Sequence, residues 1–178
     1  GAGLLALAIV AADGISAVSP TYAKDIVTEK YGAGLHTLLS GRSGSLTGIL
    51  NGIDYQSWDP AKDDVLVKNY TTETLKKRES NKRALQIESG LPIGPAPLLG
   101  VVSRLDPQKG LDLLAQVLPL VLRDSNVGLV LLGNGDASIQ AALQQLAVGF
   151  PERVALHFRF DERLSRRIYG GADMMLVP

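Results

Sequence analysis

The chain has 178 residues, 46% of them hydrophobic, and is long enough to build one or two packed domains. Lys and Arg together number 18, as do Asp and Glu, which argues against a nucleic-acid binder that works by general electrostatic attraction. The absence of Cys excludes a disulfide framework, a thiolate metal site and a Cys nucleophile, and two His residues argue against a multi-His metal site.

The first apolar run, Leu4 to Ala12, predicts a buried core helix that ends at Asp13-Gly14. No basic segment precedes it, and it is shorter than the roughly 20 residues of a membrane span, so we expect neither a targeting signal nor a membrane anchor. A short strand over Ile15–Val18 follows. Ser19-Pro20-Thr21 is a typical helix start, and it predicts a helix from Tyr22 to Tyr31.

A change in composition then marks a boundary between two domains. The Gly- and Ser-rich segment 40–47 predicts a loop, and Ile49-Leu50 predicts a strand that Asn51-Gly52 turns. We therefore place residues 1–48 in one domain and residues 49–178 in a second. The chain begins with Gly rather than Met and stops at Val177-Pro178 within a strand-like run, which predicts an internal fragment.

A charged stretch, Glu73 to Glu88, predicts a helix at the start of the second domain. Five basic residues alternate with acids along it: Lys76, Lys77, Arg78, Lys82 and Arg83. This pattern favours a solvated helix face over an anion-binding site.

From Leu98 onward, apolar strands alternate with helices. The predicted strands are Leu98–Val102, Val127–Leu132, Val154–Phe160 and Met174–Val177, and the predicted helices are Leu111–Leu122, Ala137–Val148 and Glu162–Tyr169. Strands that are apolar throughout are typical of sheets covered on both faces. The order therefore predicts an α/β fold with a parallel, doubly wound, Rossmann-like sheet.

Two cations follow the first of these strands. Arg104 and Lys109 lie where open α/β sheets bind ligands, at the carboxyl end of a strand, and together they could neutralise a pyrophosphate. The alternative is that Asp106-Pro107 starts a helix and both cations are merely solvated.

Further candidates follow other strands. Gly133 and Gly135 would let the backbone approach a ligand closely, or would form a tight turn that caps the next helix through Asp136 or Ser138. Phe160 could stack on a nucleobase or pack in the core. Asn51 could donate a hydrogen bond to a sugar or form an Asn-Gly turn. The residues alone favour the structural alternative in each case.

Several segments, in order along the chain, resemble one family. V-S-P-T-Y-A (residues 18–23), G-I-L-N-G-I-D (48–54) and V-S-R-L-D-P-Q-K-G-L-D-L (102–113) resemble blocks of the glycogen and starch synthases, which are retaining glycosyltransferases of the GT-B fold. The resemblance covers nearly the whole chain. Each block is only moderately specific, but their combination is specific.

The resemblance implies a role for each candidate. Arg104 and Lys109 are expected to grip the diphosphate of the donor as catalytic residues, Asn51 to face the donor sugar or cleft, Gly133 and Gly135 to lie beside the nucleotide, and Phe160 to stack on adenine. It implies ADP-glucose as donor and an α-1,4-glucan as acceptor, with no metal, no other cofactor and no nucleic-acid partner. It also implies a cytoplasmic location in a bacterium, or a plastid in a plant, and an isolated fragment without activity.

Two other hypotheses stay open at this point. One is another nucleotide-sugar transferase, similar to the sucrose or trehalose synthases, which share the Arg/Lys element. The other is a non-catalytic nucleotide-binding module. A nicotinamide-dependent dehydrogenase is disfavoured because the glycine fingerprint of that class is incomplete and out of register here.

Overall fold

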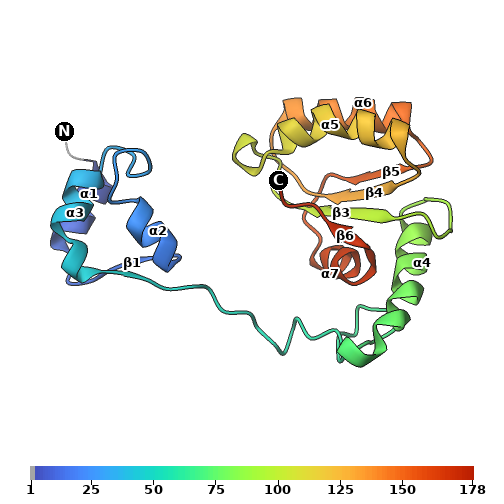
Figure 1. Ribbon diagram of the computed structural model, residues 1–178, viewed down its shortest axis with the longest axis horizontal. Coiled ribbons are helices and arrows are strands. Elements are labelled where there is room, and N and C mark those ends of the chain that lie inside the picture. Colours follow the sequence, from blue (N-terminus) through green and yellow to red (C-terminus); the bar gives the residue numbers. More distant parts are fainter. Residues whose placement is uncertain (1–2) are drawn as a thin grey trace. The chain divides into compact units, whose positions relative to one another are not determined.

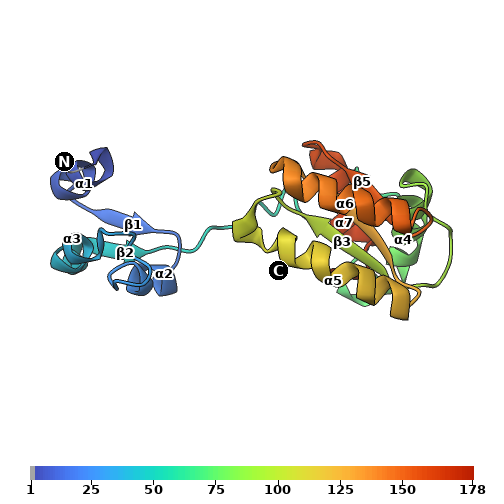
Figure 2. The same cartoon turned by 90° about the horizontal axis from the view of Figure 1, so that it is seen from above.

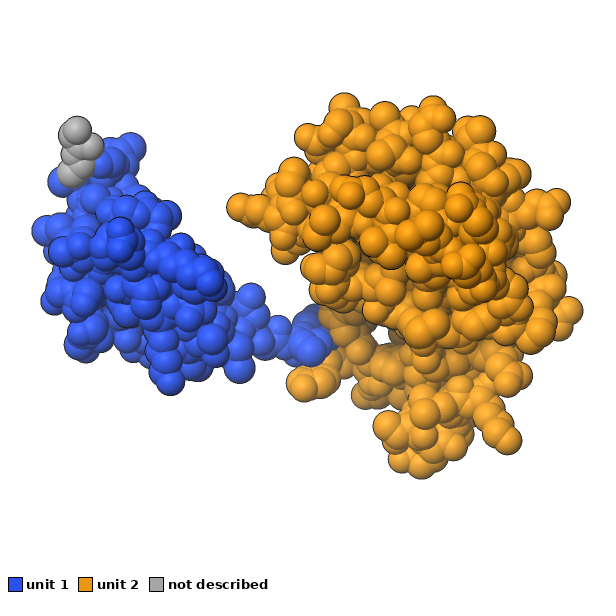
Figure 3. All heavy atoms as spheres, turned by 45° about the horizontal axis from the view of Figure 1, so that its top comes forward, with its two compact units in different colours: residues 1–54 blue, residues 55–178 orange. Residues whose placement is uncertain are grey.

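The computed structural model describes residues 3–178, which form two compact units. The first ends at Asp54 and the second comprises Tyr55–Pro178 (Figure 3). Residues 49–54 have no regular secondary structure. The predicted domain division after residue 48 falls at the start of this segment and stays a prediction.

The first unit is a small α/β arrangement around a two-stranded parallel sheet. Its strands, β1 (Ile15–Ala17) and β2 (Leu46–Gly48), pair with Ile15 opposite Leu46. Three helices accompany them: α1 (Leu4–Ala11), α2 (Pro20–Asp25) and α3 (His36–Gly41). A 3₁₀-helix over Ser43–Ser45 leads into β2. A small core of Ile9, Ala17, Ile26 and Leu39 holds these elements together.

The predicted helices of this unit differ from the observed ones. The predicted helix start at Ser19-Pro20-Thr21 is confirmed for α2, because the Ser19 hydroxyl accepts a hydrogen bond from the Tyr22 N–H. However, α2 ends at Asp25, well before Tyr31, since both the N–H and the hydroxyl of Thr28 donate to the Asp25 carbonyl and turn the chain. The prediction that α1 is buried is wrong within this unit, where Ile9 is its one buried residue among those described.

The predicted loop over residues 40–47 is also wrong. It contains the end of α3 and most of β2, and the predicted strand at Ile49-Leu50 is irregular instead. Residues 46–48 form a strand because they pair with β1, which lies about 30 positions earlier in the chain, and a local pattern does not show such a pairing. A Cβ at Gly48 would lie 2.3 Å from the Ser19 carbonyl oxygen, so the turn before α2 packs directly on this glycine.

The second unit is built on a four-stranded parallel sheet, which confirms the predicted fold class. The strand order is β5-β4-β3-β6, with β3 at Leu98–Val102, β4 at Gly128–Leu132, β5 at Val154–His157 and β6 at Met174–Met175. β5 ends before the predicted Phe160 because the Arg159 N–H donates to the His157 carbonyl in a tight turn. β6 is short because it pairs only with Leu99 and Gly100 of β3.

Helices cover both faces of this sheet (Figure 1). α5 (Leu111–Asp124) and α6 (Ala137–Gly149) lie side by side on one face, as Figure 2 shows. α4 (Arg78–Glu88) and α7 (Glu162–Gly171) pack against each other on the other face. The predicted inward face of α5 is confirmed, since Leu111, Leu118 and Leu122 are fully buried.

The charged stretch before β3 is not one solvated helix. It consists of a 3₁₀-helix (Thr72–Lys77) followed by α4. Two of its five cations are engaged by neighbouring parts of the fold: Arg78 donates hydrogen bonds to carbonyls at the end of α7, and the Lys82 ammonium lies 2.7 Å from an Asp173 carboxylate oxygen. The solvated interpretation is wrong for these two, because α4 packs on α7.

Candidate functional site

The carboxyl ends of β3 and β4 continue as two loops that remain paired. The Leu105 N–H donates to the Asn134 carbonyl at 3.0 Å, and the Asp136 N–H donates to the Leu105 carbonyl at 2.7 Å. These bonds extend the sheet ladder beyond Val102 and Leu132. The loop that carries Arg104 is therefore fixed to the Gly133–Gly135 loop.

The two glycines are required by this close approach of backbones. A Cβ at Gly133 would lie 2.0 Å from the Ser103 carbonyl oxygen. Gly135 has a φ of +154°, and its Cβ would lie 2.3 Å from the Leu105 carbonyl oxygen. The glycines thus pack against protein backbone, and a further role beside a bound nucleotide stays a prediction.

A pocket of about 570 Å³ opens at this edge of the sheet. Three parts of the second unit line it: the two strand-end loops, the start of α7 with the residues before it, and one side chain from the segment before α4. The lining residues are Trp58, Val102, Ser103, Arg104, Leu132, Gly133, Asn134, Arg159, Phe160, Asp161, Glu162 and Ser165. Arg104, Gly133 and Phe160, predicted from the sequence, are thus brought together.

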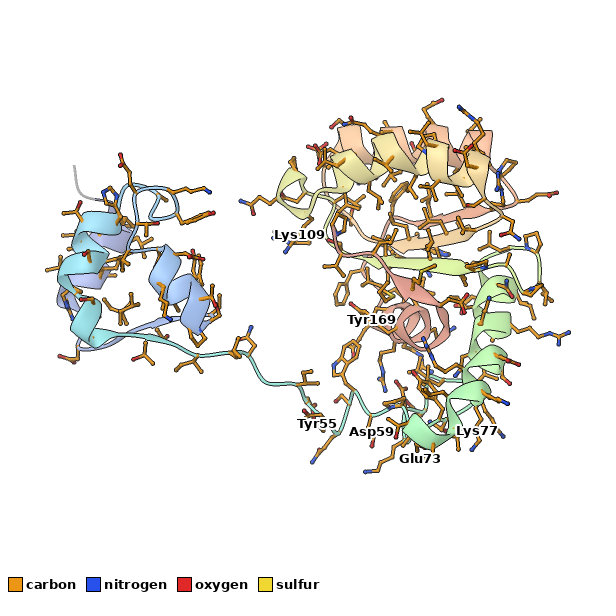
Figure 4. All side chains as sticks on the ribbon, in the orientation of Figure 1. Tyr55, Asp59, Glu73, Lys77, Lys109 and Tyr169 are labelled. Carbon is orange, nitrogen blue, oxygen red and sulfur yellow. The ribbon has the colours of Figure 1, made fainter. Side chains whose placement is uncertain are left out.

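Both predicted cations are exposed. Arg104 lines the pocket, whereas Lys109 ends a 3₁₀-helix (Pro107–Lys109) beyond the same strand and is not a lining residue (Figure 4). Within residues 3–178, no hydrogen bond or ion pair engages either side chain. Two unpaired cations at a strand's carboxyl end suit an anionic ligand.

The helices that start at this edge are capped in different ways. Asp136 accepts hydrogen bonds from the Ser138 and Ile139 N–H groups, which confirms the predicted capping turn. A bond from the Ser138 hydroxyl, and then the two N–H bonds, lower the pKa of Asp136. Asp161 caps α7 in the same manner through the Leu164 N–H, which lowers its pKa. α5 instead follows Gly110, which has no side chain to cap it. The first N–H groups of α5 therefore have no side-chain cap of the kind that Asp136 and Asp161 provide.

Phe160 and Asn51 lie in different units. Phe160 is 91% exposed at the pocket, so it is not a core residue. Phe158, two residues earlier, packs against the core under α5 and α6. Asn51 is exposed in the first unit, and its predicted role stays a prediction.

The sequence reasoning missed several lining residues. Arg159 and Asp161 form an ion pair at 2.9 Å beside Phe160, and Trp58 lines the pocket from a segment that precedes Arg104 by 46 residues. A charged pair that flanks an exposed aromatic after a strand was a usable signal for the first two. Nothing in the local pattern around Trp58 indicates the pocket, because only the tertiary fold brings that segment there.

A larger hollow, of about 800 Å³, lies along α4. Two of its four cations, Arg78 and Lys82, are bound to carbonyls of α7 and to Asp173. These two stabilise the packing of α4 on α7, and the pocket at the strand ends, which contains three of the residues predicted from the sequence, is the better ligand site.

Among the residues that the structure describes, no group of three or more His, Asp or Glu side chains is arranged to hold a metal ion. None of the helices formed by residues 3–178 is both long and apolar enough to cross a membrane.

Comparison with known families agrees with this geometry. Residues 2–41 match the model of the starch synthase catalytic domain, and residues 96–178 match that of the glycosyl transferases group 1. A glycogen synthase 2 of Nitrosococcus oceani is 46% identical over 96% of this chain and 35% of its own length. A glycogen synthase of Aromatoleum aromaticum is 49% identical over 94% of this chain and 34% of its own length.

Solved structures extend the likeness to three dimensions. The catalytic domain of starch synthase IV from Arabidopsis thaliana, bound to ADP and acarbose, matches 98% of this chain and 36% of its own, with a TM-score of 0.90 and 36% identity. A Rickettsia africae glycosyltransferase shares the fold, with a TM-score of 0.59 and 18% identity. The chain spans about a third of the length of these relatives. Over nearly its whole length, then, this chain is homologous to the glycogen and starch synthases and has the α/β architecture of the GT-B glycosyltransferases.

Proposed function

We propose that this chain carries the diphosphate- and base-binding part of a retaining glucosyltransferase that uses ADP-glucose to extend an α-1,4-glucan at its non-reducing end. The observation that carries the proposal is the pair of unengaged cations, Arg104 and Lys109, at the same edge of the sheet as a pocket that exposes Phe160. The names of the glycogen synthase relatives, and the ADP and acarbose in the starch synthase structure, support it.

The proposed roles follow from chemistry. The planar Arg104 guanidinium can donate two parallel hydrogen bonds to phosphate oxygens, and the Lys109 ammonium adds a mobile point charge. As the bond between glucose and the diphosphate breaks, negative charge grows on the leaving group, and both cations stabilise it more strongly than they stabilise the ground state. They catalyse the step in this way without taking up a proton.

The remaining predicted residues have supporting roles in this proposal. Phe160 stacks on the adenine, Gly133 and Gly135 keep the adjoining loop close to the nucleotide, and Asn51 bonds the donor sugar. A location in the bacterial cytoplasm, or in a plastid, stays a prediction from the resemblance.

The first test is ADP binding by the 178-residue chain, measured by isothermal titration calorimetry. Hydrogen bonds to charged groups are worth about 1.5–3 kcal/mol, so we expect Arg104→Ala and Lys109→Ala each to weaken ADP binding roughly tenfold to hundredfold. The weakening should be smaller for AMP, which has a single phosphate. UDP serves to compare the base preference.

Lys77→Ala is the matched control. Like Lys109, Lys77 is an exposed lysine at the end of a 3₁₀-helix, but it precedes α4, away from the strand ends (Figure 4). It should leave ADP affinity unchanged. Equal losses for Lys77→Ala and Lys109→Ala would show that the effect is general electrostatics, and the proposed site would be wrong.

A further inference from the structure

Trp58 forms a wall of the pocket that comes from outside the strand-end loops and α7. Its side chain lines the same pocket as Arg104 and Phe160, and it is 42% exposed. The rest of the lining belongs to residues 102–165, whereas Trp58 precedes α4. Its position therefore depends on how the segment 58–70 is held.

The Trp58 ring packs on α7. Its centroid lies 5.7 Å from that of Tyr169, with the rings at 74°, an edge-to-face contact that is favourable for aromatic rings (Figure 4 shows Tyr169 on α7). Trp58 also borders a second hollow, of about 150 Å³, whose other walls include Asp63 and Arg166. One side of the indole thus faces the pocket, and the other side faces the contact between the segment and α7.

An ion pair joins this segment to α7. The Arg166 Nε and Nη2 donate to the two carboxylate oxygens of Asp63 at 2.8 and 2.6 Å. The side chains are only 15% and 6% exposed, so the pair is largely shielded from water. Planar, bidentate geometry of this kind fixes orientation as well as distance.

Two further contacts support the ion pair. Leu66 is buried and packs so closely on Gly170 of α7 that a Cβ there would lie 2.5 Å from a Leu66 methyl group. The Asn81 side chain of α4 accepts from the Lys68 N–H and donates to the Lys68 carbonyl, at 2.9 and 2.8 Å. The segment is consequently held at three points, and Trp58 lies at its pocket end.

We propose that Trp58 contacts the nucleoside of the bound donor, and that the Asp63–Arg166 ion pair is a positioning device that holds Trp58 at the pocket. The inference rests on the proposed function, because it assumes that the pocket takes a nucleoside diphosphate. A half-exposed indole presents a large apolar face, and stacking of a base on an aromatic ring is a common source of nucleotide affinity.

The test uses ADP as the probe and the full 178-residue chain, in which Trp58 is the single tryptophan. Saturating ADP should change the intensity or wavelength of its fluorescence emission. In calorimetry, Trp58→Ala should weaken ADP binding roughly tenfold, and Trp58→Phe should keep most of the affinity. Inorganic pyrophosphate, which has no base, should bind Trp58→Ala and the parent chain equally.

The ion pair is tested by Asp63→Asn, which removes the charge and retains the shape of the side chain. We expect a several-fold weaker ADP affinity. In combination with Trp58→Ala the two losses should not add, because a displaced Trp58 and an absent one are equivalent for the ligand. A merely structural ion pair would lower the melting temperature and give additive effects.

Glu88→Gln is the matched control. Glu88 pairs with Arg167, the neighbour of Arg166 on α7, at the same 2.6 Å, but neither residue lines the pocket. It should leave ADP affinity unchanged, and thermal melts should show all variants folded. If Asp63→Asn fails to fold, Trp58→Ala and the fluorescence titration still decide the nucleoside contact.

The outcomes separate the two proposals. If ADP binds, and binding depends on Arg104 but neither changes the emission of Trp58 nor responds to Trp58→Ala, the inference is wrong and the proposed function stands. If ADP does not bind at all, both are wrong. Additive losses in the double variant would overturn the positioning role of the ion pair.

Discussion

Arg78 is predicted to be a major stabilising residue of the second unit, although it belongs to a stretch of charges that suggests solvent exposure. Its guanidinium donates to three carbonyls at the end of α7: those of Tyr169 at 3.2 Å, Gly170 at 3.2 Å and Ala172 at 2.7 Å. It also lies over the Tyr70 ring, 5.6 Å from the centroid. The last carbonyls of a helix have no partner within the helix and carry partial negative charge, so a cation there is favourable.

Substitution of Arg78 by Met keeps an apolar stem of similar length and removes every donor. Hydrogen bonds from a charged group are worth about 1.5–3 kcal/mol when buried, and the end-of-helix charge adds about 0.3–1 kcal/mol. The group is only partly buried and water can replace some of the bonds. We therefore expect a loss of about 2–4 kcal/mol in the free energy of unfolding.

Urea denaturation, monitored by circular dichroism, measures this loss. In a thermal melt, the melting temperature should fall by roughly 10 °C for a unit of this size. Arg83→Met is the control, because Arg83 is an exposed arginine of the same helix whose side chain forms no hydrogen bond or ion pair within residues 3–178. It should change stability by less than about 0.5 kcal/mol. A similar, small change for both substitutions would refute the reasoning that Arg78 anchors α7.

Two further predictions concern the strand-end loops and the edge strand. Gly133→Ala places a Cβ against the Ser103 carbonyl, so we expect it to cost about 1–3 kcal/mol in stability and to weaken ADP binding, whereas Gly149→Ala, where space is open, should be neutral in both measurements. Burial, and then the charge of Arg159, lower the pKa of His157 below its ordinary 6.5. The folded chain therefore resists protonation of His157 that the unfolded chain accepts, and stability should fall as the pH drops below about 6.5. Denaturation midpoints between pH 8 and pH 5 should show a shallower fall for His157→Gln, and equal slopes for the two chains would contradict this assignment.

The alternating half of the chain was predictable because its pattern is local. Each strand from Leu98 to Leu132 is a continuous apolar run, and α5 repeats Leu at the spacing of one helix face. A parallel sheet buried on both faces needs that pattern. The position of Arg104 at the ligand edge was predictable for the same reason, since the carboxyl ends of parallel strands meet on one side of a sheet.

The first unit was less predictable because its elements are short. Three-residue strands such as β2 leave almost no periodic signal, and they are defined by pairing with β1. In α1, apolar residues on every side give no indication of which face is covered.

The sequence by itself determined the order of strands and helices in the second unit, the sheet edge that carries Arg104 and Lys109, and the capping turn at Asp136, because each depends on residues within a few positions of one another. Only the tertiary structure decided that Trp58 lines the pocket and that Arg78 bonds the end of α7. Those contacts join residues 44 to 94 positions apart, counted from Trp58 to Val102 and from Arg78 to Ala172, and their geometry follows from the packing of whole elements.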